Sequence, residues 1–233
     1  IYRMFHAIIS HEIELKKPKA VSMLIAYEKL TMEQQVFIQQ ALRGQNILVE
    51  ACVGSGKTTA IQALCNFYPP EKRILYLTYN KLLKLDAQNR ILRPNVKVTN
   101  YHGFAYGELV RHGIRPGVSD TIVRYNKAKL PAAGWDVLIL DEYQDIEHDI
   151  ADMLFYLKEQ NPGMQIIAVG DICQKIYDKT TLDASSFIYD LLGKNMTPME
   201  FTRCFRLSSG LAQSLSMVWG KKIVGVNPDC DVE

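Results

Sequence analysis

The sequence predicts an α/β domain built around a parallel central sheet. Short apolar segments typical of strands alternate with segments of helical periodicity from about residue 30 onward. One of these segments, residues 137–140, is apolar throughout, as expected of a strand that helices cover on both faces. The chain has 233 residues, of which 48% are hydrophobic, and is therefore long enough for one core and the beginning of another.

The predicted elements follow one another in a regular order. Thr31 is expected to cap a helix that runs to Arg43, where Gly44 provides a stop signal. The strands of the sheet are expected at residues 46–50, 74–78, 96–99, 137–140 and 165–169. Helices are expected at residues 57–67, around 82–85, at 104–110, at 119–130 with Ser119 as the cap, and at 153–160. Residues 1–29 have no clear pattern beyond a short helix at 21–30, and we assign them no function.

The pattern starts again after about residue 197, with a strand at 199–202 and a helix at 209–219. We therefore expect residues 30–195 to form a first domain and residues 196–233 to form the truncated beginning of a second one. A small insertion in the first domain is expected at residues 108–135.

Composition narrows the class of protein. The chain has 27 Lys and Arg against 25 Asp and Glu, so a surface for nucleic acid would have to be a local basic patch. Its five cysteines are odd in number and have no CxxC spacing, which argues against a disulfide framework and a zinc site. This pattern favours an intracellular protein of the cytoplasm or nucleus. We find no run of 18 apolar residues and no signal-peptide pattern, and we expect neither a membrane span nor secretion.

A phosphate-binding loop is predicted at residues 51–59, ACVGSGKTT, between a strand and a helix. Its glycines let the backbone fold around an anion, and the following helix N-terminus favours phosphate. Lys57 is expected to reach the β and γ phosphates of ATP, and the Thr58 hydroxyl is expected to hold Mg²⁺. The residues expected to bind the nucleotide here are Gly54, Ser55, Gly56, Lys57, Thr58 and Thr59. A glycine-rich turn without a ligand is the alternative, and the flanking strand and helix argue against it.

An acidic segment, DEYQD at residues 141–145, directly follows the apolar strand. Ligands gather at the carboxyl ends of parallel strands, so Asp141 is expected to complete the Mg²⁺ site with Thr58. Glu142 is placed to orient or deprotonate the attacking water. The alternative is a solvated acidic turn that caps the next helix, which is common in general but disfavoured by the loop upstream.

Several collinear motifs resemble those of UvrD/Rep-type helicases of superfamily 1. Residues 51–58, 141–145 and 169–177 match the patterns AxxGSGKT, DExQD and VGDxxQxIY in this order. Residues 30–34 resemble the adenine-reading Q motif, and residues 204–206 resemble motif IV. Residues 78–81 and 99–107 resemble motifs Ia and Ib, and their sequences are most similar to those of the F-box helicase branch. The resemblance covers about residues 30–207.

This resemblance implies a RecA-like first motor domain and an ATPase that steps along single-stranded DNA in the 3′ to 5′ direction. It implies that Gln34 binds the adenine edge, that Phe205 stacks on the adenine and that Gln174 senses the γ phosphate. It also implies that Arg206 acts as an arginine finger from the second domain. The residues that it places along the DNA groove are Tyr79, Asn80, Tyr101, His102 and Tyr177. Tyr79 could equally be a core aromatic, and a lone histidine such as His102 is ordinarily structural.

Three departures from the family pattern are visible. The segment 178–180, DKT, stands where the family has a tryptophan, the insertion at 108–135 is short, and motifs V and VI are not present. The partners that the resemblance implies are single-stranded DNA and the remainder of the second motor domain. Without motifs V and VI, the 233-residue chain alone is expected to bind nucleotide weakly and to hydrolyse it poorly. A regulatory or scaffolding nucleotide-binding module without motor activity is the alternative. The intact Lys57, Asp141, Glu142 and Gln174 favour the motor.

Overall fold

The computed structural model describes residues 27–79, 81–91, 93–117, 119–132, 134–174 and 182–229. Its centre is a six-stranded sheet of order β3-β2-β4-β5-β1-β6, in which every neighbouring pair is parallel. The strands are β1 Ile47–Ala51, β2 Ile74–Thr78, β3 Val96–Asn100, β4 Val137–Asp141, β5 Gln165–Gly170 and β6 Thr197–Phe201. The predicted α/β fold with a parallel central sheet is confirmed.

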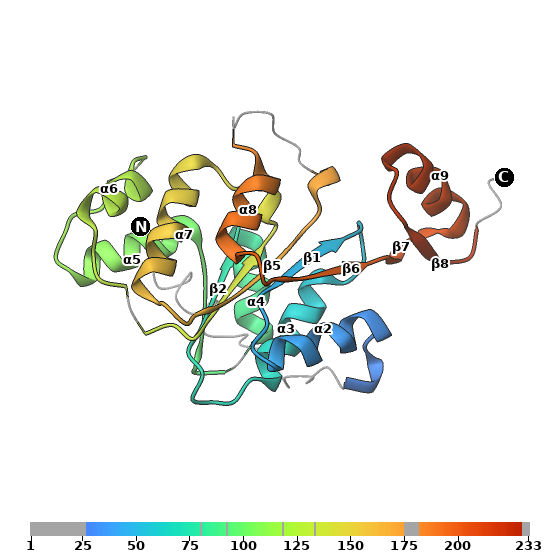
Figure 1. The fold of residues 1–233 in the computed structure, drawn as a ribbon, viewed down its shortest axis with the longest axis horizontal. Helices are drawn as coiled ribbons and strands as arrows, with labels where there is room; N and C mark the ends of the chain where they lie inside the picture. Colours follow the sequence, from blue (N-terminus) through green and yellow to red (C-terminus); the bar gives the residue numbers. More distant parts are fainter. Residues whose placement is uncertain are drawn as a thin grey trace, which may run out of the picture.

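Helices cover both faces of this sheet (Figure 1). They are α2 Met32–Leu42, α3 Lys57–Phe67, α4 Lys81–Arg90, α5 Tyr101–Arg111, α6 Thr121–Ala128, α7 His148–Gln160 and α8 Ala184–Leu192, with 3-10 turns η1 Tyr27–Lys29, η2 Tyr143–Asp145 and η3 Ile172–Gln174. Successive residues of a strand point to opposite faces. In β4, Leu138 and Leu140 therefore pack with α5, α7 and α8, whereas Val137 and Ile139 pack with α2 and α3. This double burial explains the continuous apolar run in the sequence.

A small C-terminal unit follows β6 and extends away from the sheet (Figure 1). It consists of β7 Arg203–Ser208, α9 Ser209–Trp219 and β8 Val224–Asn227, and its two strands pair in parallel. The strand that we expected to open a second domain is instead β6, which lies beside β1 in the main sheet. A parallel strand that arrives after a helix has the same sequence pattern whether it joins an existing sheet or begins a new one. The pattern alone therefore placed the boundary several residues too early.

Several helix ends also differ from the sequence predictions. The helix after β3 begins at Tyr101, because the Asn100 side chain caps it by accepting a hydrogen bond from the Gly103 N–H at 2.8 Å. Helix α6 begins at Thr121, after Asp120 rather than Ser119. Helix α8 had no counterpart in the prediction. No helix in the described ranges has the length and apolar character needed to cross a bilayer.

Candidate functional site

The phosphate-binding loop connects β1 to α3, as the sequence predicts. Gly54 and Gly56 have left-handed backbones, with φ of 66° and 79°, a conformation that residues with a Cβ atom rarely adopt. The space around them is also limited. A Cβ atom on Gly54 would lie 2.7 Å from the Cβ of Arg206, and one on Gly56 would lie 2.8 Å from Nε2 of Gln34. The loop therefore needs glycine at both positions.

This loop forms one wall of a cavity of about 270 Å³. The cavity is lined by Val53, Gly54, Ser55, Gly56, Lys57, Thr58, Thr59, Leu83, Glu142, Gln174 and Arg206. Residues predicted for the nucleotide site thus meet from four separate segments: the loop, the end of β4, the turn after β5, and β7. Three other predicted site residues, Gln34, Asp141 and Phe205, are not among the described residues that line it.

Lys57 and Glu142 face each other across this cavity. The Lys57 Nζ lies 3.5 Å from Oε1 of Glu142, and Gln144 donates a hydrogen bond from its Nε2 to Oε2 of Glu142 at 2.9 Å. Glu142 has a left-handed backbone with φ of 56°, an unusual conformation for a residue with a side chain. The turn holds the carboxylate toward the loop, where it forms an ion pair with Lys57.

Asp141 lies behind these residues and is fully buried. Its Oδ2 accepts a hydrogen bond from the Tyr76 hydroxyl at 2.8 Å, while its Oδ1 is buried and has no hydrogen-bond partner among the residues that the structure describes. Burial raises the pKa of this carboxyl to about 7, and the neighbouring Glu142 charge adds to the rise. Sequence reasoning did not identify Tyr76, because a tyrosine inside an apolar strand gives no sign of the residue it will face.

The arrangement at Asp141 fits a divalent cation. A buried carboxylate oxygen without a partner is costly, and a cation at that oxygen would satisfy it. Mg²⁺ is commonly bound through one or two carboxylates together with water and the phosphates of the substrate. Within the described ranges, no group of three or more His, Cys, Asp and Glu side chains is arranged to hold a metal by itself. Asp141 and the Thr58 hydroxyl are therefore the residues suited to hold Mg²⁺ with a nucleotide.

Gln34 is bound to the phosphate-binding loop rather than free at the cavity. It is 4% exposed, and its Nε2 donates hydrogen bonds to the carbonyls of Ser55 at 3.1 Å and Gly56 at 3.4 Å. Its Oε1 accepts from the Thr31 N–H at 3.0 Å, which completes the capping box of α2. This side chain therefore ties the start of α2 to the loop, and the predicted contact with adenine stays a prediction.

Strand β7 passes directly over the loop. The Phe205 N–H donates to the Gly54 carbonyl at 2.9 Å, and the next residue, Arg206, lines the cavity. The Phe205 side chain is 46% exposed. Because adjacent side chains on a strand point to opposite sides, only one of the two can face the cavity. The geometry places Arg206 there, and the stacking of Phe205 on adenine stays a prediction.

Gln174 reaches the cavity from the turn after β5. Its Nε2 donates to Oδ2 of Asp171 at 2.6 Å, and Asp171 is fully buried at the end of the strand. Asp171 also receives the backbone N–H of Cys173 on its Oδ1 at 3.1 Å. The carboxylate therefore organises the whole turn that carries Gln174. The motif in the sequence contains Asp171, but sequence reasoning assigned it no role.

The residues predicted to line a DNA groove have different positions. His102 is exposed and lines an open hollow of about 540 Å³ together with Tyr106 and Arg115. Tyr79 is half-buried against the core. The prediction for Tyr101 is wrong, because this residue is 1% exposed and packs in the core as the first residue of α5. Asn80 and Tyr177 lie outside the described residues.

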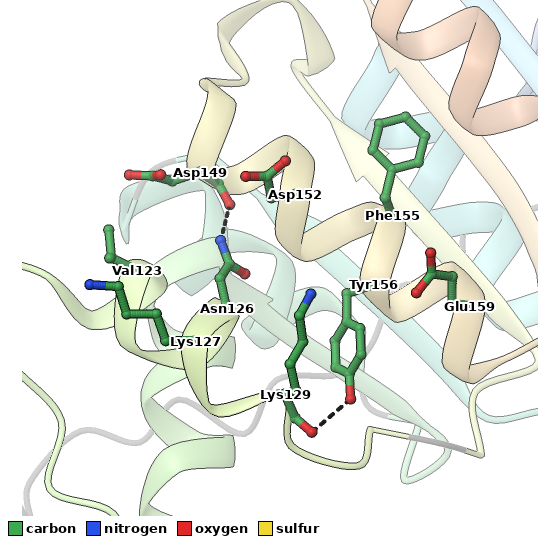
Figure 2. A pocket seen from close by; sticks show the side chains of 9 residues that line it. All are labelled: Val123, Asn126, Lys127, Lys129, Asp149, Asp152, Phe155, Tyr156 and Glu159. Carbon is green, nitrogen blue, oxygen red and sulfur yellow. Dashed lines mark hydrogen bonds between the residues drawn. The ribbon is translucent and has the colours of Figure 1, made fainter.

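Another hollow, of about 510 Å³, lies between α6 of the short insertion and α7 (Figure 2). The Lys129 Nζ lies 4.5 Å from the centre of the Tyr156 ring, and the Tyr156 hydroxyl donates to the Lys129 carbonyl at 2.7 Å. Asn126 donates to the Asp149 carbonyl at 2.8 Å. These contacts join the insertion to the main domain, and the hollow lies apart from the phosphate-binding loop.

A parallel α/β sheet with a phosphate-binding loop after β1 and carboxylates at the end of β4 defines a P-loop NTPase domain. More specifically, the chain belongs to the AAA_19 family of AAA domains, whose family model matches residues 34–180. No curated protein matches the sequence. The resemblance to superfamily 1 helicases is confirmed at the level of this family and the RecA-like fold.

Solved structures of helicases have a similar fold. The Pif1 helicase from Candida albicans aligns with a TM-score of 0.51 and 17% identity, over 82% of this chain and 43% of that one. The Pif1 helicase from Bacteroides in complex with ADP-AlF3 and ssDNA aligns with a TM-score of 0.48 and 21% identity, over 76% and 43% of the two chains. Arterivirus nonstructural protein 10, a helicase in complex with DNA, has a TM-score of 0.48 and 14% identity, over 84% and 48%. The chain thus spans less than half the length of these helicases.

Proposed function

We propose that this chain is the nucleotide-binding part of an ATP-driven motor that moves along single-stranded DNA. The observation that carries the proposal is the meeting of Lys57, Glu142, Gln174 and Arg206 in one cavity, each from a different segment. Two positive side chains, a carboxylate and an amide around a glycine-rich loop are the groups that phosphoryl transfer requires. The fold shared with a Pif1 helicase supports a helicase rather than another NTPase.

The residues of the cavity have distinct roles in this proposal. The loop N–H groups and Lys57 bind the β and γ phosphates of ATP, and this releases Glu142 from its ion pair with Lys57. Glu142 then accepts a proton from the attacking water. Asp141 and Thr58 hold Mg²⁺, which neutralises charge on the phosphates when it is bound. Arg206, on strand β7 of the C-terminal unit, stabilises the negative charge of the phosphoryl group that is transferred.

The C-terminal unit is proposed to begin the second motor domain. Because β6 pairs with β1 in the main sheet, we place the beginning of this second domain at about residue 203, where β7 starts, rather than at residue 196 as the sequence predicts. The 3′ to 5′ direction and the DNA contacts of Tyr79, Asn80, His102 and Tyr177 are carried over from the resemblance to UvrD/Rep-type helicases. The exposed position of His102 is compatible with this role.

The test is ATP turnover, with and without single-stranded DNA, by the motor protein that contains this chain. We expect turnover that DNA increases, and we expect Lys57→Ala to abolish it, because Lys57 is the main positive charge on the β and γ phosphates. Lys72→Ala is the matched control, since Lys72 is an exposed lysine that pairs with Asp136 at the surface. ATP binding without turnover would favour the regulatory or scaffolding module. Normal turnover in Lys57→Ala would rule out this site.

A further inference from the structure

Asp171 connects the cavity to a residue of the C-terminal unit. Its Oδ2 accepts from Nε2 of Gln174 at 2.6 Å, and its Oδ1 lies 2.8 Å from Nζ of Lys221. Asp171 is fully buried, and the Lys221 side chain is 17% exposed. A charged pair that is this well shielded from water is screened much less by salt than a surface pair. A single carboxylate therefore joins the lysine of one unit to the amide of the other.

Lys221 also approaches a second carboxylate. Its Nζ lies 3.7 Å from Oε2 of Glu50, whose Oε1 accepts a hydrogen bond from the Tyr143 hydroxyl. Glu50 and Asp171 are near each other because β1 and β5 pair in register, with Glu50 opposite Gly170. Lys221 thus supplies one positive charge between two partly or fully buried negative ones. Without it, the two carboxylates would repel each other and Asp171 would be buried without a counter-charge.

The position of Lys221 is fixed relative to Arg206 by the C-terminal unit itself. Strand β8, which begins three residues after Lys221, pairs with β7, which carries Arg206. The turn that contains Lys221 is held by the Ile223 N–H, which donates to the Ser216 hydroxyl at 2.8 Å. The same small unit therefore contacts the nucleotide site at two points, with Arg206 at the loop and Lys221 at Asp171.

We propose that Lys221 is a positioning residue for the nucleotide site. It holds Asp171, and Asp171 holds the amide of Gln174 in the orientation that faces the cavity. Movement of the C-terminal unit away from the sheet withdraws Lys221 and Arg206 together, so the orientation of Gln174 depends on the position of that unit. This proposal rests on the proposed function for the role of Gln174, whereas the ion pair and the amide contact are independent of it.

The test compares Lys221→Met with Lys221→Arg and with Lys222→Met in the motor protein that contains this chain. Lys222 is the matched control, because it is the next residue and is exposed. We expect Lys221→Met to lower kcat for ATP on the order of ten- to a hundredfold, the scale of a misplaced group, with little change in KM. Lys221→Arg should restore much of kcat, and Lys222→Met should leave kcat unchanged. In a Gln174→Ala background, Lys221→Met should cause no further loss, because both changes act on the same group.

The NMR signal of the Gln174 side-chain amide provides a readout that does not need catalysis. We expect this signal to shift in Lys221→Met, to remain in Lys222→Met and to return toward its original position in Lys221→Arg. If the wild-type motor protein turns over no ATP, the proposed function fails while the amide signal still tests the positioning. If Lys221→Met does not fold, Lys221→Gln takes its place, because glutamine keeps a hydrogen-bond donor without the charge. It is compared with Lys221→Arg by the same measurements. An unchanged amide signal, or losses in kcat that add fully in the double variant, would overturn the proposal.

Discussion

Two neighbouring residues, one beside the cavity and one lining it, have features that lower the stability of the fold. Asp141 is a buried carboxyl with one oxygen lacking a hydrogen-bond partner among the described residues, and Glu142 has a left-handed backbone. Lys57 and Glu142, both of which line the cavity, form an ion pair. Such features are concentrated at sites that bind charged ligands. At the scale of the residue, the nucleotide site is therefore ready for both an anion and a cation.

The raised pKa of Asp141 predicts a pH-dependent stability. The folded chain binds this proton more tightly than the unfolded chain, so it loses stability as the pH rises from about 4 to about 7. In the absence of nucleotide and Mg²⁺, we expect Asp141→Asn to raise the free energy of unfolding near pH 8. The difference between 3.8 and about 7 corresponds to at most about 4 kcal/mol, at about 1.36 kcal/mol per pKa unit. Denaturant unfolding of both chains checks this. A gain of equal size at about pH 2.5 would contradict it, because the carboxyl is then mostly protonated in both states.

The two neighbouring carboxylates are expected to have different phenotypes. Glu142→Gln should leave ATP binding nearly intact and slow hydrolysis by roughly a hundredfold or more, because the amide cannot accept the proton. Asp141→Asn should instead weaken the Mg²⁺-dependent binding of ATP. Equilibrium binding and single-turnover hydrolysis, measured for each variant with and without Mg²⁺, separate the two effects. If the phenotypes are reversed, the assigned roles are wrong.

How far the sequence predicts single residues depends on the distance between partners along the chain. Lys57, Thr58 and Glu142 belong to short local motifs whose backbone carries them to the cavity. The contact of Tyr76 with Asp141 joins residues 65 positions apart, and that of Asp171 with Lys221 joins residues 50 positions apart. No pattern within one segment indicates such a partner, so these contacts had to come from the structure.

At the scale of elements, strand β7 and the phosphate-binding loop are packed too closely for a larger residue. Gly54→Ala would introduce a Cβ atom 2.7 Å from the Cβ of Arg206, on a backbone that is already left-handed. We expect this change to displace β7 and to weaken ATP binding at least tenfold, which corresponds to about 1.4 kcal/mol. Equilibrium binding of ATP with Mg²⁺ measures the effect.

Gly107→Ala is the control for this experiment. Gly107 lies within α5, and a Cβ atom there would have no other atom within 4 Å. An alanine in a helix interior is expected to stabilise the chain by about 0.4 to 1 kcal/mol and to leave ATP binding unchanged. If Gly54→Ala and the wild-type chain bind ATP equally well, the close packing of β7 on the loop does not affect ATP binding and the prediction is wrong.

The elements themselves were predictable where their signals are local. The five strands β1 to β5 follow from apolar runs between turn signals, and the N-cap of α2 follows from Thr31. The assignment of β6 to a second domain was wrong, because strand pairing is decided by which sheet edge is open and not by the sequence of the strand. Helix α8 was not predicted, even though its N-cap residue is of a common type: the Asp183 side chain accepts hydrogen bonds from the N–H groups of Ser185 and Ser186.

At the scale of the whole molecule, the nucleotide cavity is shared between the main sheet and the C-terminal unit. The sheet supplies Lys57, Glu142 and Gln174, and the C-terminal unit supplies Arg206. When a site is divided in this way, binding of a nucleotide can change the position of the two parts relative to each other. The family and fold could be predicted from collinear motifs. The resemblance also implied that Arg206 reaches the site from outside the first domain, whereas the hydrogen bond between β7 and the loop came from the structure.

The position of Arg206 with a nucleotide bound tests the central claim most directly. The measurement is a crystal structure of the chain with a non-hydrolysable ATP analogue and Mg²⁺. We predict that Arg206 and Lys57 both contact the phosphates at charge-assisted hydrogen-bond distances of about 2.7 to 2.9 Å. If the analogue binds elsewhere, or if Arg206 pairs with a surface carboxylate while the phosphates lie in the loop, the claim of one shared hydrolytic site is contradicted.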